Sequence, residues 1–150
     1  MSKVIAITGG ARGIELATAK ALHAQGAKLA IGDIDGDEAV RAAAAIGPGV
    51  LASSLDVTDT NSFREFLALT ERELGPLDVL INNAGIMPIG PWLEEADSTA
   101  RRVLDINIFG VISGMKLALP GMVSRGHGHI INIASIAGKS PVPEIGRAHV

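Results

Sequence analysis

The chain has 150 residues, of which 47% are hydrophobic and 19% charged, and its formal net charge is -3. This balance fits one soluble domain with a single core, and without a Lys/Arg-rich block it excludes an obvious nucleic-acid or membrane-surface partner. The absence of cysteine excludes disulfides and thiolate metal sites. No uninterrupted apolar run reaches about 18 residues, the length of a membrane span, and the first residues show no signal-peptide pattern, so we expect a cytoplasmic protein.

Short apolar runs alternate with helical patterns along the whole chain. The runs read as buried strands at Val4–Ile7, Lys28–Ile31, Val50–Leu55, Leu77–Ile81 and Ile130–Ala134. Helices are predicted from Ile14 to the stop at Gly26, over Glu38–Ala45, from Asp59 to Gly75 and over Ser98–Leu119, with Asp35 and Asp59 as caps. This alternation predicts right-handed crossovers and therefore an α/β fold with a doubly wound parallel sheet.

A glycine-rich turn joins the first strand to the first helix, with the sequence Thr8-Gly9-Gly10-Ala11-Arg12-Gly13-Ile14-Glu15. Such a turn lets backbone N–H groups and the helix N-terminus face a pyrophosphate. Any tight strand-to-helix turn can use glycines, so the turn alone leaves a purely structural role open. A P-loop is excluded, because Lys-Ser/Thr does not follow the second glycine.

Asp33 follows the second predicted strand, about 20 residues beyond the glycine-rich turn. A carboxylate there can bind both hydroxyls of an adenosine ribose and repels a 2′-phosphate, which favours NAD over NADP. The alternative is a solvated turn aspartate. Arg12 is a counter-signal, because a guanidinium beside the turn can accept a phosphate.

Six motifs follow one another in a familiar order: Thr8-Gly9-x-x-x-Gly13-Ile14, Asp33, Asp56-Val57, Asn82-Asn83-Ala84-Gly85, Asn107 and Ser135. In order and spacing the sequence resembles the short-chain dehydrogenases/reductases, up to about Pro143. The resemblance implies a Rossmann-type sheet of order 3-2-1-4-5 whose C-terminal part is missing. It also implies NAD(P)-dependent hydride transfer with a small alcohol or ketone substrate, and a homodimer or homotetramer for the intact protein.

The resemblance also assigns residues to the cofactor. Asp56 would bind the adenine amino group, with Val57 supplying backbone beside it. Asn83, Ala84 and Gly85 would line the cofactor trough. The glycine-rich turn would contribute the residues Gly9, Arg12, Gly13 and Ile14.

Two residues are catalytic candidates through the same resemblance. Ser135 would orient the substrate oxygen, and Asn107 would hold a water in the proton relay. Without their register with the other motifs, Ser135 reads as a cap or turn serine and Asn107 as an ordinary polar residue of a helix. His127 and His129 read as loop and strand-entry residues, because no carboxylate lies near them in sequence, so no metal is expected.

The family's catalytic tyrosine and lysine would fall near positions 148 and 152. Position 148 is Ala148, and the chain contains no tyrosine, so we expect this chain to be inactive as a dehydrogenase. Residues 1–143 are assigned to an incomplete dinucleotide-binding domain and residues 144–150 to a non-native tail. Ile145–Val150 is the translation of ATC-GGA-AGA-GCA-CAC-GTC, a widely used sequencing adapter, which predicts adapter read-through; a natural truncated variant is the alternative.

Glu15 departs from the family, which has a glycine there for close packing near the pyrophosphate. Two competing functions stay open. A non-catalytic dinucleotide-binding or regulatory protein of the same fold would match the chain as written. A methyltransferase would also have a glycine-rich first loop and an acidic second strand end, but it does not explain Asn82–Gly85, Asn107 and Ser135 together.

Overall fold

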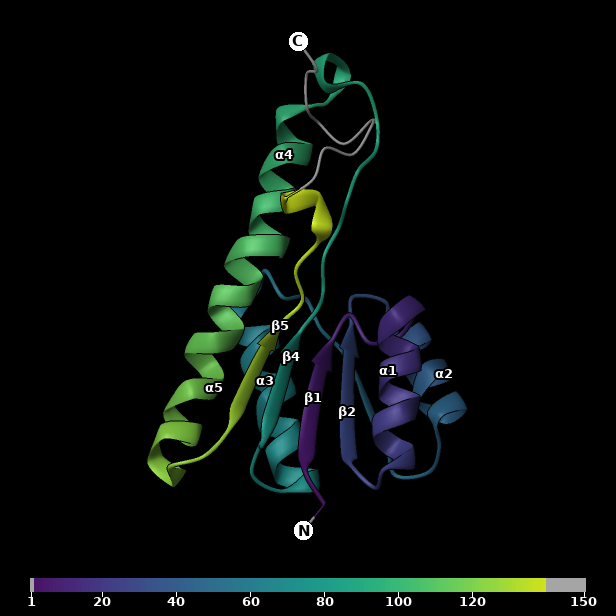
Figure 1. Cartoon of the computed structure of the whole chain (residues 1–150), viewed down its shortest axis with the longest axis vertical. Helices are drawn as coiled ribbons and strands as arrows, with labels where there is room; N and C mark the ends of the chain where they lie inside the picture. Colours follow the sequence, from purple (N-terminus) through teal and green to yellow (C-terminus); the bar gives the residue numbers. More distant parts are fainter. Residues whose placement is uncertain (1, 140–150) are drawn as a thin grey trace.

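The computed structural model describes residues 2–139, so the predicted tail at 144–150 lies outside the described residues. Its centre is a sheet of five parallel strands in the order β3-β2-β1-β4-β5, which confirms the predicted fold and strand order (Figure 1). The strands are β1 (Val4–Thr8), β2 (Lys28–Asp33), β3 (Leu51–Ser54), β4 (Val79–Asn82) and β5 (His129–Asn132). The predicted strands are found, with ends shifted by one or two residues.

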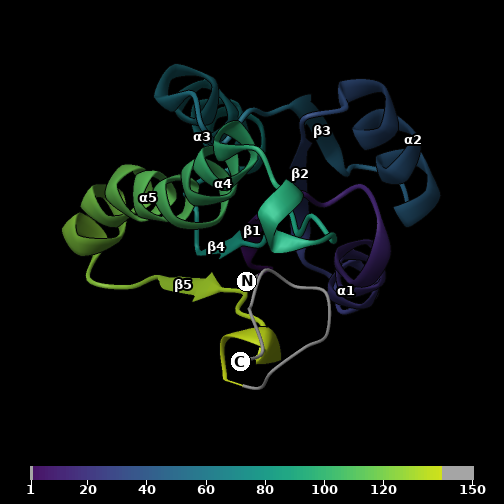
Figure 2. The ribbon, with the colours of Figure 1, turned by 90° about the horizontal axis from the view of Figure 1, so that it is seen from above.

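Helices cover both faces of the sheet, because successive strand residues point to opposite sides. On one face, Ile5 and Ile7 pack with Ala19 of α1 (Gly13–Ala24) and with α2 (Gly36–Ile46). On the other face, Ala6 and Leu80 pack with α3 (Thr60–Leu74) and α5 (Val111–Arg125). Figure 2 shows the two groups of helices on opposite sides of the sheet.

Two helices begin at the caps that the sequence predicts. Asp35 Oδ1 accepts the backbone N–H of Glu38 at 3.0 Å at the start of α2, and Asp59 Oδ1 accepts that of Asn61 at 2.8 Å at the start of α3. Each bond satisfies a helix N–H that would otherwise lack a partner. These caps fix where α2 and α3 leave the carboxyl edge of the sheet.

The apolar residue that starts the predicted helix α1, Ile14, does not face the sheet, because its side chain is 79% exposed. The helix packs on the sheet through the fully buried Ala19, with Leu16 and Leu22 partly buried. Ile14 lies in the first turn, just after the glycine-rich turn, where none of the described residues covers it. Periodicity detects a helix, but it does not choose between neighbouring apolar faces when most of the apolar residues are alanines.

The predicted helix Ser98–Leu119 is longer and is interrupted. It consists of α4 (Asp97–Leu104), a π-helical segment η2 (Asp105–Gly110) and α5, which continues through Pro120 and ends at Arg125. Asp97–Arg125 is long and apolar enough to match a membrane span, with a mean hydropathy of 1.5 over an 18-residue stretch within it. Core helices of soluble proteins can have the same length and composition. This segment was not singled out from the sequence, because only uninterrupted apolar runs were considered there.

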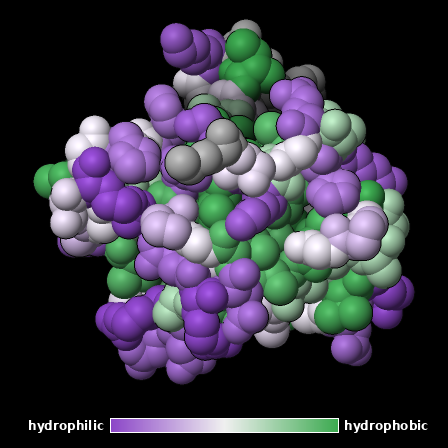
Figure 3. Space-filling view, turned by 90° about the horizontal axis from the view of Figure 1, so that it is seen from below, coloured by the Kyte–Doolittle hydropathy of each residue, from purple (hydrophilic) through white to green (hydrophobic). Residues whose placement is uncertain are grey.

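The same helical segment exposes apolar side chains on its outer side. Leu104, Ile108, Phe109, Leu119 and Val123 are between 45% and 73% exposed. Apolar residues also reach the surface between polar ones on the face at the amino ends of the strands (Figure 3). The fold leaves the outer face of α4, η2 and α5 without a cover among residues 2–139.

Candidate functional site

A cavity of about 590 Å³ opens at the carboxyl ends of β1, β2 and β4. This size lies within the roughly 300–1,000 Å³ of small-molecule pockets, and in doubly wound sheets ligands bind at this edge. The cavity is lined by Gly9, Arg12, Gly13, Glu15, Asp33, Ile34, Leu55, Asp56, Val57, Thr58, Asn83, Ala84, Gly85, Ile86, Arg102, Asp105 and Ile106.

Most of the residues that the sequence assigns to the cofactor line this one cavity. They are Gly9, Arg12, Gly13, Asp33, Asp56, Val57, Asn83, Ala84 and Gly85. Ile14 is not among the lining residues, because its side chain points from the first turn of α1 into solvent. Asn107 and Ser135 do not line the cavity either.

The glycine-rich turn brings backbone close to β4. Gly9 and Gly13 have φ values of 68° and 62°, a left-handed conformation that side chains disfavour. A Cβ added at Gly9 would lie 2.9 Å from Ala84 Cα, whereas one at Gly13 would meet only Glu15 Oε2, at 3.5 Å. Gly13 therefore leaves room above the start of α1, where free N–H groups and the helix dipole favour an anion.

Thr8 fixes the loop after β4 against this turn. Its buried hydroxyl oxygen accepts the backbone N–H groups of Asn83 and Ala84, both at 3.0 Å. Asn83 Nδ2 returns a hydrogen bond to the Thr8 carbonyl at 3.1 Å. Sequence reasoning did not name Thr8 as a site residue, although a polar residue at the end of an apolar strand signals such a role.

Asn82 and Asn83 both have local hydrogen-bond partners. Asn82 Nδ2 donates to Asn132 Oδ1 at 2.9 Å, which joins the carboxyl ends of β4 and β5. Asn82 Oδ1 is the exception: it is buried and has no hydrogen-bond partner among the described residues.

Asp33 stands at the end of β2 on the wall of the cavity. Its Oδ2 accepts the Ala11 N–H at 3.4 Å, and its Oδ1 accepts the Asp35 N–H at 3.1 Å. Asp56, two residues beyond β3, accepts the backbone N–H and the hydroxyl of Thr58 at 2.9 and 2.7 Å. Both carboxylates are therefore oriented by local donors.

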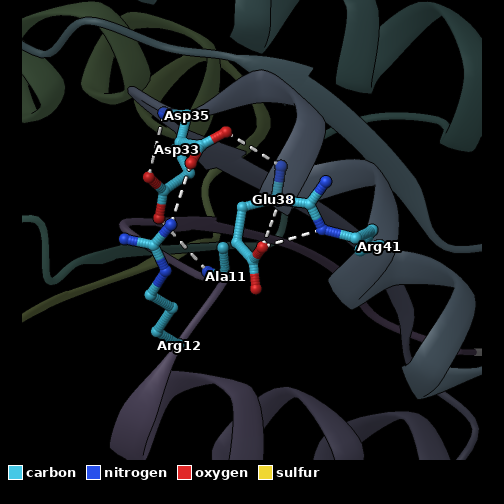
Figure 4. A network of polar contacts seen from close by, with 6 residues as sticks. All are labelled: Ala11, Arg12, Asp33, Asp35, Glu38 and Arg41. Atoms are coloured by element: carbon cyan, nitrogen blue, oxygen red, sulfur yellow. Dashed lines mark hydrogen bonds and ion pairs between the residues drawn. The ribbon is translucent and has the colours of Figure 1, made fainter.

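Asp35 carries a second link, to the glycine-rich turn. Arg12 Nη2 lies 2.8 Å from Asp35 Oδ2, and Figure 4 shows the network that includes this pair. The Glu38 N–H bond and then the Arg12 charge hold the pKa of Asp35 below its ordinary value. The carboxylate is thus ionised at neutral pH.

Neither of the two catalytic candidates lines the cavity. Asn107, in η2, binds both backbone polar groups of Ile86, a residue that lines the cavity. Ser135 is exposed between β5 and the 3-10 turn Ile136–Gly138, and its carbonyl accepts the Gly138 N–H at 3.1 Å.

The sequence also missed part of the cavity wall. Ile34, Leu55, Ile86 and Ile106 contribute apolar surface, and Arg102 and Asp105 contribute charge from α4 and η2. Over residues 2–139 no cluster of three His, Cys, Asp or Glu side chains could hold a metal ion. His127 instead approaches Asp78, with Nε2 and Oδ1 3.7 Å apart.

Known proteins are similar to this chain in sequence and in fold. The family model described as short chain dehydrogenase matches residues 3–147. A galactitol 2-dehydrogenase from Agrobacterium fabrum is 43% identical over 139 residues, which cover 92% of this chain and 54% of that protein.

Two solved structures superpose closely. An NAD⁺-bound xylitol dehydrogenase has a TM-score of 0.88 at 30% identity, over 95% of this chain and 56% of that one. A 3-ketoacyl-(acyl-carrier-protein) reductase from Brucella melitensis, complexed with NADH, has a TM-score of 0.89 at 28% identity, over 95% of this chain and 61% of that one. The chain thus spans between 54% and 61% of the length of these three proteins. By family match, sequence identity and fold, the chain belongs to the short-chain dehydrogenase family of oxidoreductases.

Proposed function

We propose that this chain is the cofactor-binding part of an NAD-dependent dehydrogenase or reductase that acts on a small alcohol or ketone. The observation that carries the proposal is the position of Asp33, whose oriented carboxylate lies on the cavity wall at the end of β2. A carboxylate at this place suits the paired hydroxyls of a ribose.

The adenine would occupy the part of the cavity beyond Asp33. Apolar side chains gather there from three separate segments, namely Ile34, Val57 and Ile106. Ile34 is 66% exposed, and contact of its apolar side chain with water is unfavourable. A flat base bound here would cover this side chain. Asp56 lines the same cavity, and its carboxylate can accept a hydrogen bond from the amino group of the base.

The pyrophosphate would lie at the start of α1. The space above Gly13 and the free N–H groups of the first helical turn fit an anion. Glu15 opposes this fit, because its carboxylate lines the same cavity. We therefore expect the dinucleotide to bind more weakly than it would with a neutral residue at position 15.

The assignment of NAD rather than NADP is supported by charge. The 2′-phosphate of NADP would lie against the Asp33 carboxylate. Two negative charges in contact repel each other strongly where solvent is partly excluded. The similar xylitol dehydrogenase and ketoacyl reductase structures hold NAD⁺ and NADH.

The bound nicotinamide would give or take a hydride, and the protein would handle the proton at the substrate oxygen. We propose that Ser135 orients that oxygen and that Asn107 keeps the loop carrying Ile86 in place and holds a relay water. The chain contains no tyrosine, so the proton donor of the family is not among its residues. We therefore propose that these 150 residues bind the dinucleotide without turning it over.

The same absence of tyrosine favours one second candidate, a non-catalytic dinucleotide-binding protein. Assays of the parent gene product separate the two proposals. NADH formation with any alcohol supports the dehydrogenase proposal. Tight NADH binding without turnover supports the non-catalytic dinucleotide-binding protein.

Calorimetric titration of the chain with NADH and NADPH tests the binding proposal. We expect the wild type to bind NADH more tightly than NADPH. Asp33→Ala should weaken the binding of NADH more than the binding of NADPH. Asp37→Ala is the matched control, because it removes the same charge from an exposed position outside the cavity. Equal losses for both ligands, or a native preference for NADPH, would refute the NAD assignment.

A further inference from the structure

A second arginine lines the cavity, from a different side than the glycine-rich turn. Arg102 lies in the last turn of α4, and this helix extends beyond the carboxyl ends of the strands (Figure 1). It belongs to the segment that follows β4, whereas Ile34 follows β2, and β1 lies between these two strands in the sheet. Arg102 and Ile34 therefore reach the cavity from different sides.

Arg102 shares its side of the helix with an apolar residue of the cavity wall. Ile106 lies four residues further along, and residues spaced by three or four positions share one side of a helix. Both residues line the cavity, and the neighbouring Arg101 does not. The side of the helix that meets the cavity thus presents an isoleucine and, one turn earlier, a planar cation.

Arg102 is also the cation of the cavity wall that has no partner among residues 2–139. Four acidic and two basic residues line the cavity: Glu15, Asp33, Asp56, Asp105, Arg12 and Arg102. Arg12 is paired with Asp35. Arg102 is exposed, and within the described residues its side chain forms neither a salt bridge nor a hydrogen bond. Its guanidinium is therefore available to a ligand, and its long stem can follow apolar surface such as that of Ile106.

The chemistry of a guanidinium matches the ligand proposed for this end of the cavity. A guanidinium is planar and stacks on aromatic rings, and its charge is attracted to their faces. An adenine placed against Ile34 and Ile106 is a flat ring with two faces, and Ile34 can cover only one of them. Arg102, which comes from another side of the cavity, is placed to cover the second.

We propose that Arg102 is a further dinucleotide-binding residue, whose guanidinium stacks on the face of the adenine that Ile34 leaves open. The inference rests on the proposed dinucleotide binding. It assigns Arg102 a contact with the base alone, separate from the ribose at Asp33 and from the pyrophosphate above Gly13. Loss of this contact should therefore weaken the binding of any ligand that carries an adenine, whether or not it carries a nicotinamide.

The test compares variants with the wild type by calorimetric titration with NADH and with ADP, which has the adenine half without the nicotinamide. Arg102→Met keeps a long stem and removes both the plane and the charge. It should weaken the binding of both ligands by the same factor, about three- to tenfold. Arg102→Lys keeps the charge without the plane, so its affinities should lie closer to those of Arg102→Met than to those of the wild type.

Arg101→Met is the matched control, because it removes the same side chain from the adjacent exposed position of α4, outside the cavity. It should bind NADH and ADP as tightly as the wild type does. A loss in Arg101→Met equal to that in Arg102→Met, or wild-type affinity in Arg102→Lys, would reveal a general effect of charge and overturn the proposal. So would unchanged affinity in Arg102→Met, or a loss for NADH that ADP does not share. Failure of the wild type and every variant to bind NADH would overturn the proposed function, and the inference about Arg102 with it.

Discussion

The side chain of Asn107 binds both backbone polar groups of Ile86: its Oδ1 accepts the N–H and its Nδ2 donates to the carbonyl, each at 2.9 Å. Asn107 lies in the π-helical segment, and Ile86 lies in the loop after β4. The two bonds attach this loop, which lines the cavity, to the long helix.

Asn107→Leu should lower the free energy of unfolding by about 1–3 kcal/mol, because it leaves two part-buried backbone groups without partners. Urea denaturation followed by circular dichroism measures the change. Asn61→Leu, at an exposed position in α3, is the control and should cost much less. Equal losses at the two positions would contradict a positioning role for Asn107.

Thr8→Val should loosen the loop after β4 while keeping the volume of the side chain. It removes the oxygen that accepts the N–H groups of Asn83 and Ala84, and we expect a loss of about 2 kcal/mol in the free energy of unfolding. NADH binding should weaken as well. Thr8→Ser retains the hydroxyl and should therefore retain NADH binding. A loss of NADH affinity in Thr8→Ser as large as in Thr8→Val would show that the hydroxyl is not what holds the loop.

Glu15→Gln should tighten NADH binding by roughly three- to tenfold, because it removes a negative charge from the helix N-terminus that would hold the pyrophosphate. Glu15→Gly removes the bulk as well and should tighten it further. Calorimetry of the two variants separates the effect of charge from that of size. Unchanged affinity in both would mean that the Glu15 side chain turns away from the ligand.

The exposed apolar face of α4, η2 and α5 should make the chain self-associate. Leu104, Phe109 and Val123 are each more than half exposed on this segment, and apolar patches of this kind drive association. Sedimentation velocity should show assemblies that shrink when Val123→Lys and Phe109→Lys are combined. Val40→Lys, at an exposed apolar site on α2, is the control and should leave the assemblies unchanged.

Local patterns predicted much of the fold, because caps and buried strands depend on a few neighbouring residues. Asp35 and Asp59 cap the helices that they were expected to cap. The π-helical turn at Asp105–Gly110 was not predicted, since nothing in the spacing of Ile106 or Phe109 distinguishes it from a regular helix.

The cavity was predicted only where motifs mark it. Asp33 and Asn83 belong to recognisable patterns, whereas Ile34, Arg102 and Ile106 reach the cavity through the packing of segments far apart in sequence. The Arg12–Asp35 pair was also beyond prediction. Arg12 on its own indicated a phosphate partner, and only the placement of two loops shows that its charge is already matched.

The structure of the chain with bound NADH tests the central claim most directly. We predict the adenosine ribose hydroxyls on the Asp33 carboxylate, the adenine against Ile34 and Ile106, and the pyrophosphate above Gly13. Arg12 should stay paired with Asp35. A dinucleotide bound elsewhere, or an empty cavity at saturating NADH, would contradict the account.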